Sequence, residues 1–288
     1  MNPANASELR AALQRHGFRF SKSKGQNFLI DPSVPRRIAE ASGADGGSFA
    51  LEIGPGAGSL TVELAARAAK VCAVELDASV LPLLQESLEG LENVEVVNAD
   101  ALKLDLCKLI SERAGGLSPL VCANLPYSIT SPLLAKIIDS GCFRLITVMI
   151  QREVAQRLCA KPGTPDYGAF TIYVNWHCRI ERLFDVPPGC FMPQPKVTSS
   201  VVRLTPLAAP PCECADAELM FRCVRASFSQ RRKTLQNALS NALPSLSREL
   251  AAAACEAAGI SPMARGETLS VADFARLADN VAVVTKNP

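Results

Sequence analysis

The pattern of apolar and polar positions predicts alternating strands and helices in the first half of the chain. Short apolar stretches recur between residues 48 and 150, separated by segments with the apolar spacing of helices. The expected strands are 49–53, 70–75, 94–97, 120–123 and 145–150, and the expected helices include 59–69 and 78–89. This alternation indicates an α/β fold of the doubly wound, Rossmann-like type, with helices on both faces of a parallel sheet.

The pattern changes after residue 168. Residues 169–176 (A-F-T-I-Y-V-N-W) and 197–204 (V-T-S-S-V-V-R-L) predict antiparallel strands that close the sheet edge. Residues 205–213 (T-P-L-A-A-P-P-C-E) have the composition of a linker, and the remainder is helical, with Ser270 and Asp273 spaced as a capping box. We therefore expect a first domain over 1–207, beginning with a basic segment over 1–25, and a small all-helical domain over 213–288.

Composition excludes several classes of protein. The chain has 288 residues and a net charge of only +2, so a nucleic-acid-binding surface would have to be local. Its 11 cysteines include no C-x-x-C pair, so we expect no metal site, and their odd number favours reduced thiols in a cytoplasmic protein. No apolar run approaches the ~20 residues that span a membrane. The basic segment is acid-poor like a transit peptide, but a structured motif at Gln26 follows it too closely for that interpretation.

A glycine-rich loop follows the first expected strand. The stretch L-E-I-G-P-G-A-G-S-L-T (51–61) places Gly54 and Gly56 where a ligand can approach the backbone closely. The dinucleotide fingerprint requires a glycine at position 59, where this chain has Ser59, so hydride chemistry with a nicotinamide cofactor is disfavoured. A purely structural turn remains an alternative for the loop alone.

The next two strands also end in polar groups. Glu75 ends V-C-A-V-E-L-D and can accept both hydroxyls of a ribose, and Asp100 in N-A-D-A can accept a hydrogen bond from an adenine amine. The alternatives are a solvated acid at Glu75 and a helix cap at Asp100. Because the carboxyl ends of parallel strands form one edge, these groups together predict an adenosine-bearing cofactor without a pyrophosphate, S-adenosylmethionine. Their neighbours Leu76 and Ala101 are included among the expected cofactor-binding residues.

The fourth expected strand runs into Asn124-Leu125-Pro126-Tyr127. This order resembles the fourth motif of adenine-N6 methyltransferases. An exocyclic adenine amine is a poor nucleophile, and the Asn124 side-chain oxygen and the Leu125 carbonyl could accept its hydrogens and orient its lone pair. Pro126 would hold that carbonyl in place, and Tyr127 would stack on the flipped base. The alternative is a β-turn with a core-facing tyrosine.

Residues 22–31, K-S-K-G-Q-N-F-L-I-D, resemble the first motif of the enzymes that dimethylate two adjacent adenosines near the 3′ end of 16S rRNA. The resemblance covers about residues 18–285. It implies that Asn27, Leu29 and Asn124 contact the cofactor, and that Phe191 of F-M-P-Q-P-K-V lies on the opposite face of the target base from Tyr127. On the residues alone, Phe191 could equally be a core anchor.

The segment F-S-Q-R-R-K-T-L-Q-N-A-L (228–239) favours the small-subunit enzymes over the related macrolide-resistance methylases, which act on large-subunit RNA. Residues 222–248 carry six Arg or Lys and no acid. We expect an RNA-binding surface there, and the alternative is a solvated helix face. The expected contacts are Arg222, Arg225, Arg231, Arg232 and Lys233.

The resemblance implies a monomeric, cytoplasmic enzyme whose substrate is 16S rRNA in the small (30S) subunit or its precursor, and which also acts as an assembly checkpoint. Three rival functions remain at this point. They are a large-subunit rRNA methylase, a non-catalytic assembly factor and, least favoured, a nicotinamide oxidoreductase.

Overall fold

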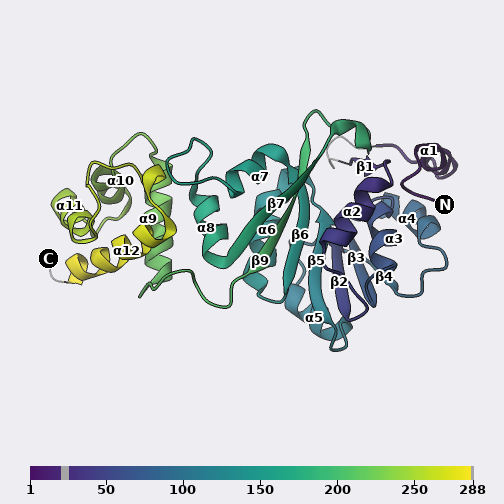
Figure 1. Ribbon diagram of the computed structural model, residues 1–288, viewed down its shortest axis with the longest axis horizontal. Helices are drawn as coiled ribbons and strands as arrows, with labels where there is room; N and C mark the ends of the chain where they lie inside the picture. Colours follow the sequence, from purple (N-terminus) through teal and green to yellow (C-terminus); the bar gives the residue numbers. More distant parts are fainter. Residues whose placement is uncertain (21–25, 287–288) are drawn as a thin grey trace. The chain divides into compact units, whose positions relative to one another are not determined.

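The computed structural model describes residues 1–20 and 26–286, so the first half of the K-S-K-G-Q-N-F-L motif lies outside the described residues. The described chain forms two compact units, residues 1–155 with 180–206 and residues 156–179 with 207–288. Figure 1 shows the sheet of the first unit and the helices of the second. None of the described helices is long and apolar enough to cross a membrane.

A seven-stranded sheet with the strand order β4-β3-β2-β5-β6-β9-β7 forms the first unit (Figure 1). The first five strands in this order are parallel, and β9 pairs antiparallel with β6. Every residue of β2 is buried, as expected for a strand covered on both faces. The strands are β2 (Ser48–Ile53), β3 (Lys70–Glu75), β4 (Val94–Asn98), β5 (Ser118–Asn124), β6 (Leu145–Gln151), β7 (Cys178–Val186) and β9 (Ser199–Pro206).

This topology confirms the α/β fold and the five strands predicted from the sequence. The strand order changes direction at β2, which has β3 on one side and β5 on the other. Ligands of open α/β sheets bind at such a switch point, beyond the carboxyl ends of the strands. The intervening helices are α2 (Ser33–Ala41), α3 (Ser59–Ala65), η2 (Ala78–Val80), α4 (Leu81–Ser87), α5 (Leu106–Arg113), η3 (Tyr127–Ile129), α6 (Thr130–Ser140) and α7 (Arg152–Leu158).

The N-terminal segment packs near the glycine loop. Helix α1 (Ala6–Arg15) buries Leu9 and Leu13 in an apolar cluster with Ala57 of the loop and Leu83 of α4. Arg15 forms an ion pair with Glu86 of α4, and the Nε2 atom of His16 lies 2.7 Å from the other oxygen of the same carboxylate. The short strand β1 (Phe28–Leu29) pairs antiparallel with β8 (Phe191–Met192), which follows η4 (Pro188–Cys190). Residues 1–20 are therefore folded onto the sheet domain through their apolar side chains.

The prediction of a strand over residues 169–176 was wrong. This segment is helix α8 (Ala169–His177), although its β-branched and aromatic residues favour strands. The Thr171 side chain caps the Gly168 amide, and Ile172 and Trp176 are buried in the helical cluster of the second unit. Tertiary packing therefore overrides local propensity, and residues 156–179 group with the second unit although the sequence boundary assigned them to the first domain.

The remainder of the second unit is helical, as expected. It contains α9 (Ala217–Ser229), α10 (Leu235–Ala242), α11 (Arg248–Ala257), η5 (Gly266–Thr268) and α12 (Val271–Lys286). The predicted capping box is present, because the Asp273 carboxylate accepts hydrogen bonds from the Ser270 amide and hydroxyl. One feature departs from the expectation of reduced thiols: Cys107 and Cys142, whose Cα atoms are 6.0 Å apart, form a disulfide.

Candidate active site

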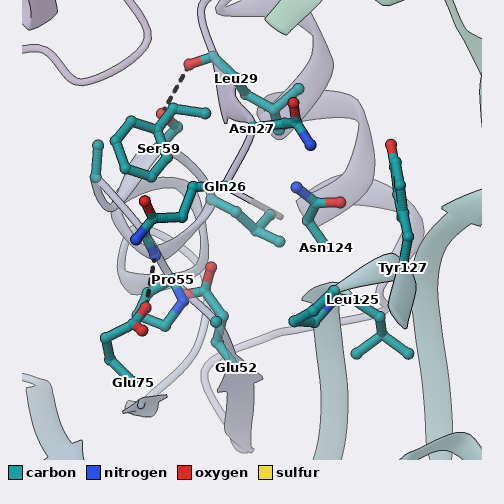
Figure 2. Close-up of a pocket in the computed structure, with 16 residues that line it drawn as sticks. Gln26, Asn27, Leu29, Glu52, Pro55, Ser59, Glu75, Asn124, Leu125 and Tyr127 are labelled. Carbon is teal, nitrogen blue, oxygen red and sulfur yellow. Dashed lines mark hydrogen bonds between the residues drawn. The ribbon is translucent and has the colours of Figure 1, made fainter. Parts of the chain in front are cut away.

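A hollow that is partly open to solvent lies at the carboxyl ends of β2 and β5 (Figure 2). Three segments that are distant in the sequence line it. The lining residues come from 26–29, from 52–60 together with Glu75, and from the predicted motif Asn124, Leu125, Pro126 and Tyr127. The structure thus brings Asn27, Leu29, Gly54, Gly56, Glu75 and the 124–127 motif to one site, as the sequence predicted.

Two glycines shape the floor of this hollow. Gly54 and Gly56 have φ values of +71° and +55°, which side-chain-bearing residues rarely adopt. A Cβ atom on Gly56 would lie 2.9 Å from the Phe28 ring, and one on Gly54 would lie 3.9 Å from the Asn124 carbonyl oxygen. Gly56 therefore allows β1 to approach the loop closely, whereas at Gly54 the positive φ, and not a clash with the end of β5, favours glycine.

Glu75 connects the end of β3 to the glycine loop. One carboxylate oxygen accepts the Gly56 amide at 3.2 Å, and the other accepts the Asp77 amide at 2.8 Å. The side chain is buried, and this burial raises the pKa of its carboxyl group despite those two hydrogen bonds. Glu75 is thus oriented by backbone groups on both sides while it lines the hollow, which is the arrangement needed to accept ribose hydroxyls.

The other expected cofactor-binding residues follow β3 and β4, beyond the lining of this hollow. Leu76 is 64% exposed, which is unusual for a leucine beside a buried strand end, and it presents an apolar surface next to Glu75. The Asp100 carboxylate accepts the Leu102 amide at 2.9 Å within a turn, and it caps no helix, because the N-cap residue of α5 is Asp105. The loop that contains Asp100 and Ala101 is tied to β3, because the Ala99 amide donates to the Glu75 carbonyl.

Asn124 ends β5 and lies between Asn27 and Tyr127 in Figure 2. Its side-chain oxygen Oδ1 is buried and has no hydrogen-bond partner among the described residues. A buried acceptor without a partner costs free energy, about 1–3 kcal/mol, unless a ligand satisfies it. Leu125 is anchored in the core with 1% exposure, and Pro126 has φ −58°. These two residues fix the direction of the backbone that follows Asn124.

Tyr127 begins the short helix η3 and is half-buried at the edge of the hollow. Its phenol oxygen lies 2.6 Å from the Ser199 hydroxyl of β9. Burial raises the pKa of the phenol, so the group is neutral at physiological pH. The tyrosine therefore lines the hollow, while its hydroxyl points to a buried residue of the sheet.

Sequence reasoning missed Glu52, which lines the hollow from β2. It is 1% exposed, and burial, with a smaller contribution from the Glu75 charge, raises the pKa of its carboxyl group to about 8. Its oxygen Oε2 has no hydrogen-bond partner among the described residues. A signal was present, because Glu52 is the one charged residue in the buried strand S-F-A-L-E-I.

The structure places Phe191 outside the hollow, unlike the expectation from the resemblance. The residue is 3% exposed and belongs to the core cluster that contains Leu29, its partner in the β1–β8 pair. The strand pairing buries the ring, which corresponds to the core anchor that the residues alone left open.

The five expected RNA contacts all belong to the second unit. Arg222 and Arg225 are exposed on α9, and Arg232 and Lys233 are exposed in the loop before α10. Arg231 differs, because its guanidinium donates to the Pro165 and Tyr167 carbonyls and pairs with Glu267 at 3.2 Å. Arg231 therefore holds this unit together, and the other four cations form no side-chain hydrogen bond or ion pair within the described part of the chain. No group of three or more His, Cys, Asp or Glu able to hold a metal occurs among the described residues.

Comparisons with known proteins agree with this geometry. The model of the ribosomal RNA adenine dimethylase family matches residues 17–282. The ribosomal RNA small subunit methyltransferase A of Geobacillus thermodenitrificans is 47% identical over 280 residues, 96% of each chain, and that of Clostridium perfringens is 44% identical over 93% of each chain.

Two solved structures are also similar. The 23S rRNA methyltransferase ErmE has 30% identity and a TM-score of 0.67, covering 88% of this chain and 99% of its own. A dimethyladenosine transferase from Plasmodium falciparum has 27% identity and a TM-score of 0.70, covering 86% and 95%. From the family match and the near-complete coverage of its relatives, this chain belongs to the ribosomal RNA adenine dimethylase family.

Proposed function

We propose that this protein is an S-adenosylmethionine-dependent enzyme that dimethylates N6 of two adjacent adenosines in the 3′-terminal hairpin loop of 16S rRNA. The names and high identity of the small-subunit methyltransferases support this substrate. The enzyme would act in the cytoplasm as a monomer on the 30S subunit or its precursor, and its release after methylation would mark a completed subunit.

The hollow fits the proposed cofactor. Gly54 and Gly56 allow close approach, Glu75 presents oriented oxygens to a ribose, and the exposed Leu76 can cover an adenine face. The proposed binding residues are Asn27, Leu29, Gly54, Gly56, Glu75, Leu76, Asp100, Ala101 and Asn124. When bound, S-adenosylmethionine supplies an electrophilic methyl group on a sulfonium.

The single observation that carries the proposal is the partnerless, buried Oδ1 of Asn124. An adenine amine donates hydrogen bonds, and Oδ1 together with the Leu125 carbonyl would accept both of its hydrogens. These two hydrogen bonds would direct the nitrogen lone pair towards the methyl donor. Positioning of this kind accounts for a large share of an enzyme's rate enhancement. Tyr127 would stack on the flipped base, contributing about 1–3 kcal/mol. Because Phe191 lies in the core, we assign stacking to Tyr127 alone.

The exposed cations of the second unit would bind RNA phosphates. Arg222, Arg225, Arg232 and Lys233 can each neutralise a phosphate, whereas Arg231 is already held by three acceptors. Binding would therefore weaken as salt concentration rises.

The decisive experiment is mass spectrometry of rRNA from cells that lack this protein and from cells complemented with wild type, Asn124→Ala or the control Asn280→Ala. Asn280 lies on α12, far along the chain from the site, and its amide donates only to a local carbonyl. We expect N6-dimethyladenosine in 16S rRNA with wild type and Asn280→Ala but not with Asn124→Ala. Dimethyladenosine in 23S rRNA would favour a large-subunit methylase, and unchanged modification with Asn124→Ala would favour a non-catalytic assembly factor.

A further inference from the structure

The Ser199 hydroxyl forms a hydrogen bond with the phenol oxygen at the end of the Tyr127 ring. Ser199 Oγ lies 2.6 Å from the phenol oxygen, and the two residues are 72 positions apart in the chain. Ser199 is fully buried, and its backbone is fixed by pairing with Gln151 at the start of the β6–β9 ladder. The hydroxyl is therefore a rigid anchor built into the sheet.

The Tyr127 side chain is less constrained by packing than Ser199. It begins a three-residue helix in which no residue is fully buried, and part of its ring is open to solvent. Packing alone therefore leaves its two side-chain torsions room to vary, and the hydrogen bond to Ser199 restricts them before any base arrives. Such preorganisation reduces the entropy that must be lost when a ligand binds.

We propose that Ser199 is a positioning residue that sets the Tyr127 ring for stacking, and that this matters more for the second methyl transfer than for the first. This inference rests on the proposed function. In each transfer the N6–C bond forms as the C–S bond of the sulfonium breaks, the cofactor departs as a thioether, and one N6 proton passes to water.

The two transfers differ in how the amine can be held. The unmodified amine has two hydrogens for Asn124 Oδ1 and the Leu125 carbonyl, whereas the monomethylated amine has one. The base then loses one of its two hydrogen bonds, and its placement depends more on stacking against Tyr127. A ring that is free to tilt should therefore impair the second transfer selectively.

The strand offers a matched control. Ser200 is the next residue, equally buried, but its hydroxyl donates to Asp185 at 2.6 Å on the other face of β9. Ser199→Ala and Ser200→Ala thus remove the same atom from adjacent buried positions, and Ser199 alone faces Tyr127. Ser199→Thr restores a hydroxyl, and Tyr127→Phe removes the other partner of the hydrogen bond.

The test is single-turnover methylation of small subunits that lack the modification, with mono- and dimethyladenosine measured separately. With Ser199→Ala we expect the second transfer to slow by about two- to tenfold, the range for loss of one hydrogen bond, so that monomethyl product accumulates. The first transfer and the cofactor Kd should change less than about twofold. Ser200→Ala should match wild type, Ser199→Thr should restore the wild-type product ratio, and Ser199→Ala with Tyr127→Phe should be no worse than either alone.

A Ser199→Ala enzyme with the wild-type product ratio would overturn the inference. So would an equal loss in both transfers together with weaker cofactor binding, because that pattern indicates general damage to the fold. Failure of the proposed function is a separate result, since the wild-type protein would then make no dimethyladenosine at all.

Discussion

Gln26 donates a hydrogen bond of 2.6 Å from Nε2 to Asp77, and this contact joins the N-terminal segment to the end of the third strand. The Asp77 amide in turn donates to Glu75, whose other oxygen accepts the Gly56 amide. Asp77 also caps η2 through the Ser79 amide. One continuous network therefore connects the segment that carries Asn27 and Leu29, the proposed ribose-binding carboxylate and the glycine loop.

Loss of the Gln26 contact should weaken cofactor binding. A hydrogen bond to a charged group contributes about 1.5–3 kcal/mol, so Gln26→Leu should raise the S-adenosylmethionine Kd by roughly tenfold or more. The exposed Gln14 of α1 supplies the control Gln14→Leu. Calorimetry measures both variants, and equal affinities for wild type and Gln26→Leu would show that the network does not serve the cofactor.

Burial of Glu52 should make stability depend on pH. Its folded-state pKa is about 8 against an ordinary value of 4.5, so the folded protein keeps a proton that the unfolded chain releases above pH 4.5. The unfolding free energy should therefore fall as pH rises from about 4.5 to 8. Glu52→Gln removes this loss and should be more stable than wild type by up to about 4 kcal/mol at pH 8, with no difference near pH 4.

Urea unfolding at several pH values measures this effect, with the exposed Glu89→Gln as control. Parallel stability profiles for wild type and Glu52→Gln would mean that the carboxyl group is ionised in the folded protein.

Gly56→Ala should damage the site through two separable effects. Both Gly56 and Gly116 have positive φ, +55° and +85°, so alanine at either position is strained by about 1–2 kcal/mol. Only at Gly56 does the added Cβ meet another residue, the Phe28 ring at 2.9 Å, whereas nothing lies within 4 Å at Gly116. We expect Gly116→Ala to lose stability alone and Gly56→Ala to lose cofactor binding as well. Thermal unfolding and calorimetry compare the two, and normal cofactor affinity in Gly56→Ala would contradict the close packing of β1.

The neighbouring residues Arg231 and Arg232 should behave differently. Arg231 contacts two carbonyls and Glu267, so Arg231→Ala should lower the unfolding free energy by about 1–3 kcal/mol. Arg232 is exposed, so Arg232→Ala should leave stability unchanged and weaken RNA binding while reducing the salt slope by about 1. RNA-binding titrations at several salt concentrations distinguish the two, and an unchanged slope with Arg232→Ala would exclude a phosphate contact.

Much of the site could be predicted because its residues follow strands in a regular order. Glu75 and Asn124 each end a parallel strand and Gly54 directly follows one, and parallel strands bring their carboxyl ends to one edge whatever the details of packing. Glu52 escaped prediction although it is the one charged residue of its strand, because a charged residue inside a strand usually faces solvent, and the structure shows it to be 1% exposed.

The amino-acid sequence by itself determined the alternation of strands and helices, the glycine loop and the order Asn-Leu-Pro-Tyr, because these depend on local periodicity and backbone chemistry. Tertiary structure alone decided that residues 169–176 form a helix, that Phe191 is buried, that Arg231 is held by carbonyls and that Ser199 meets Tyr127. The physical reason is that each of these outcomes depends on partners many residues away, and local propensity is weaker than the free energy of burying apolar surface and pairing polar groups.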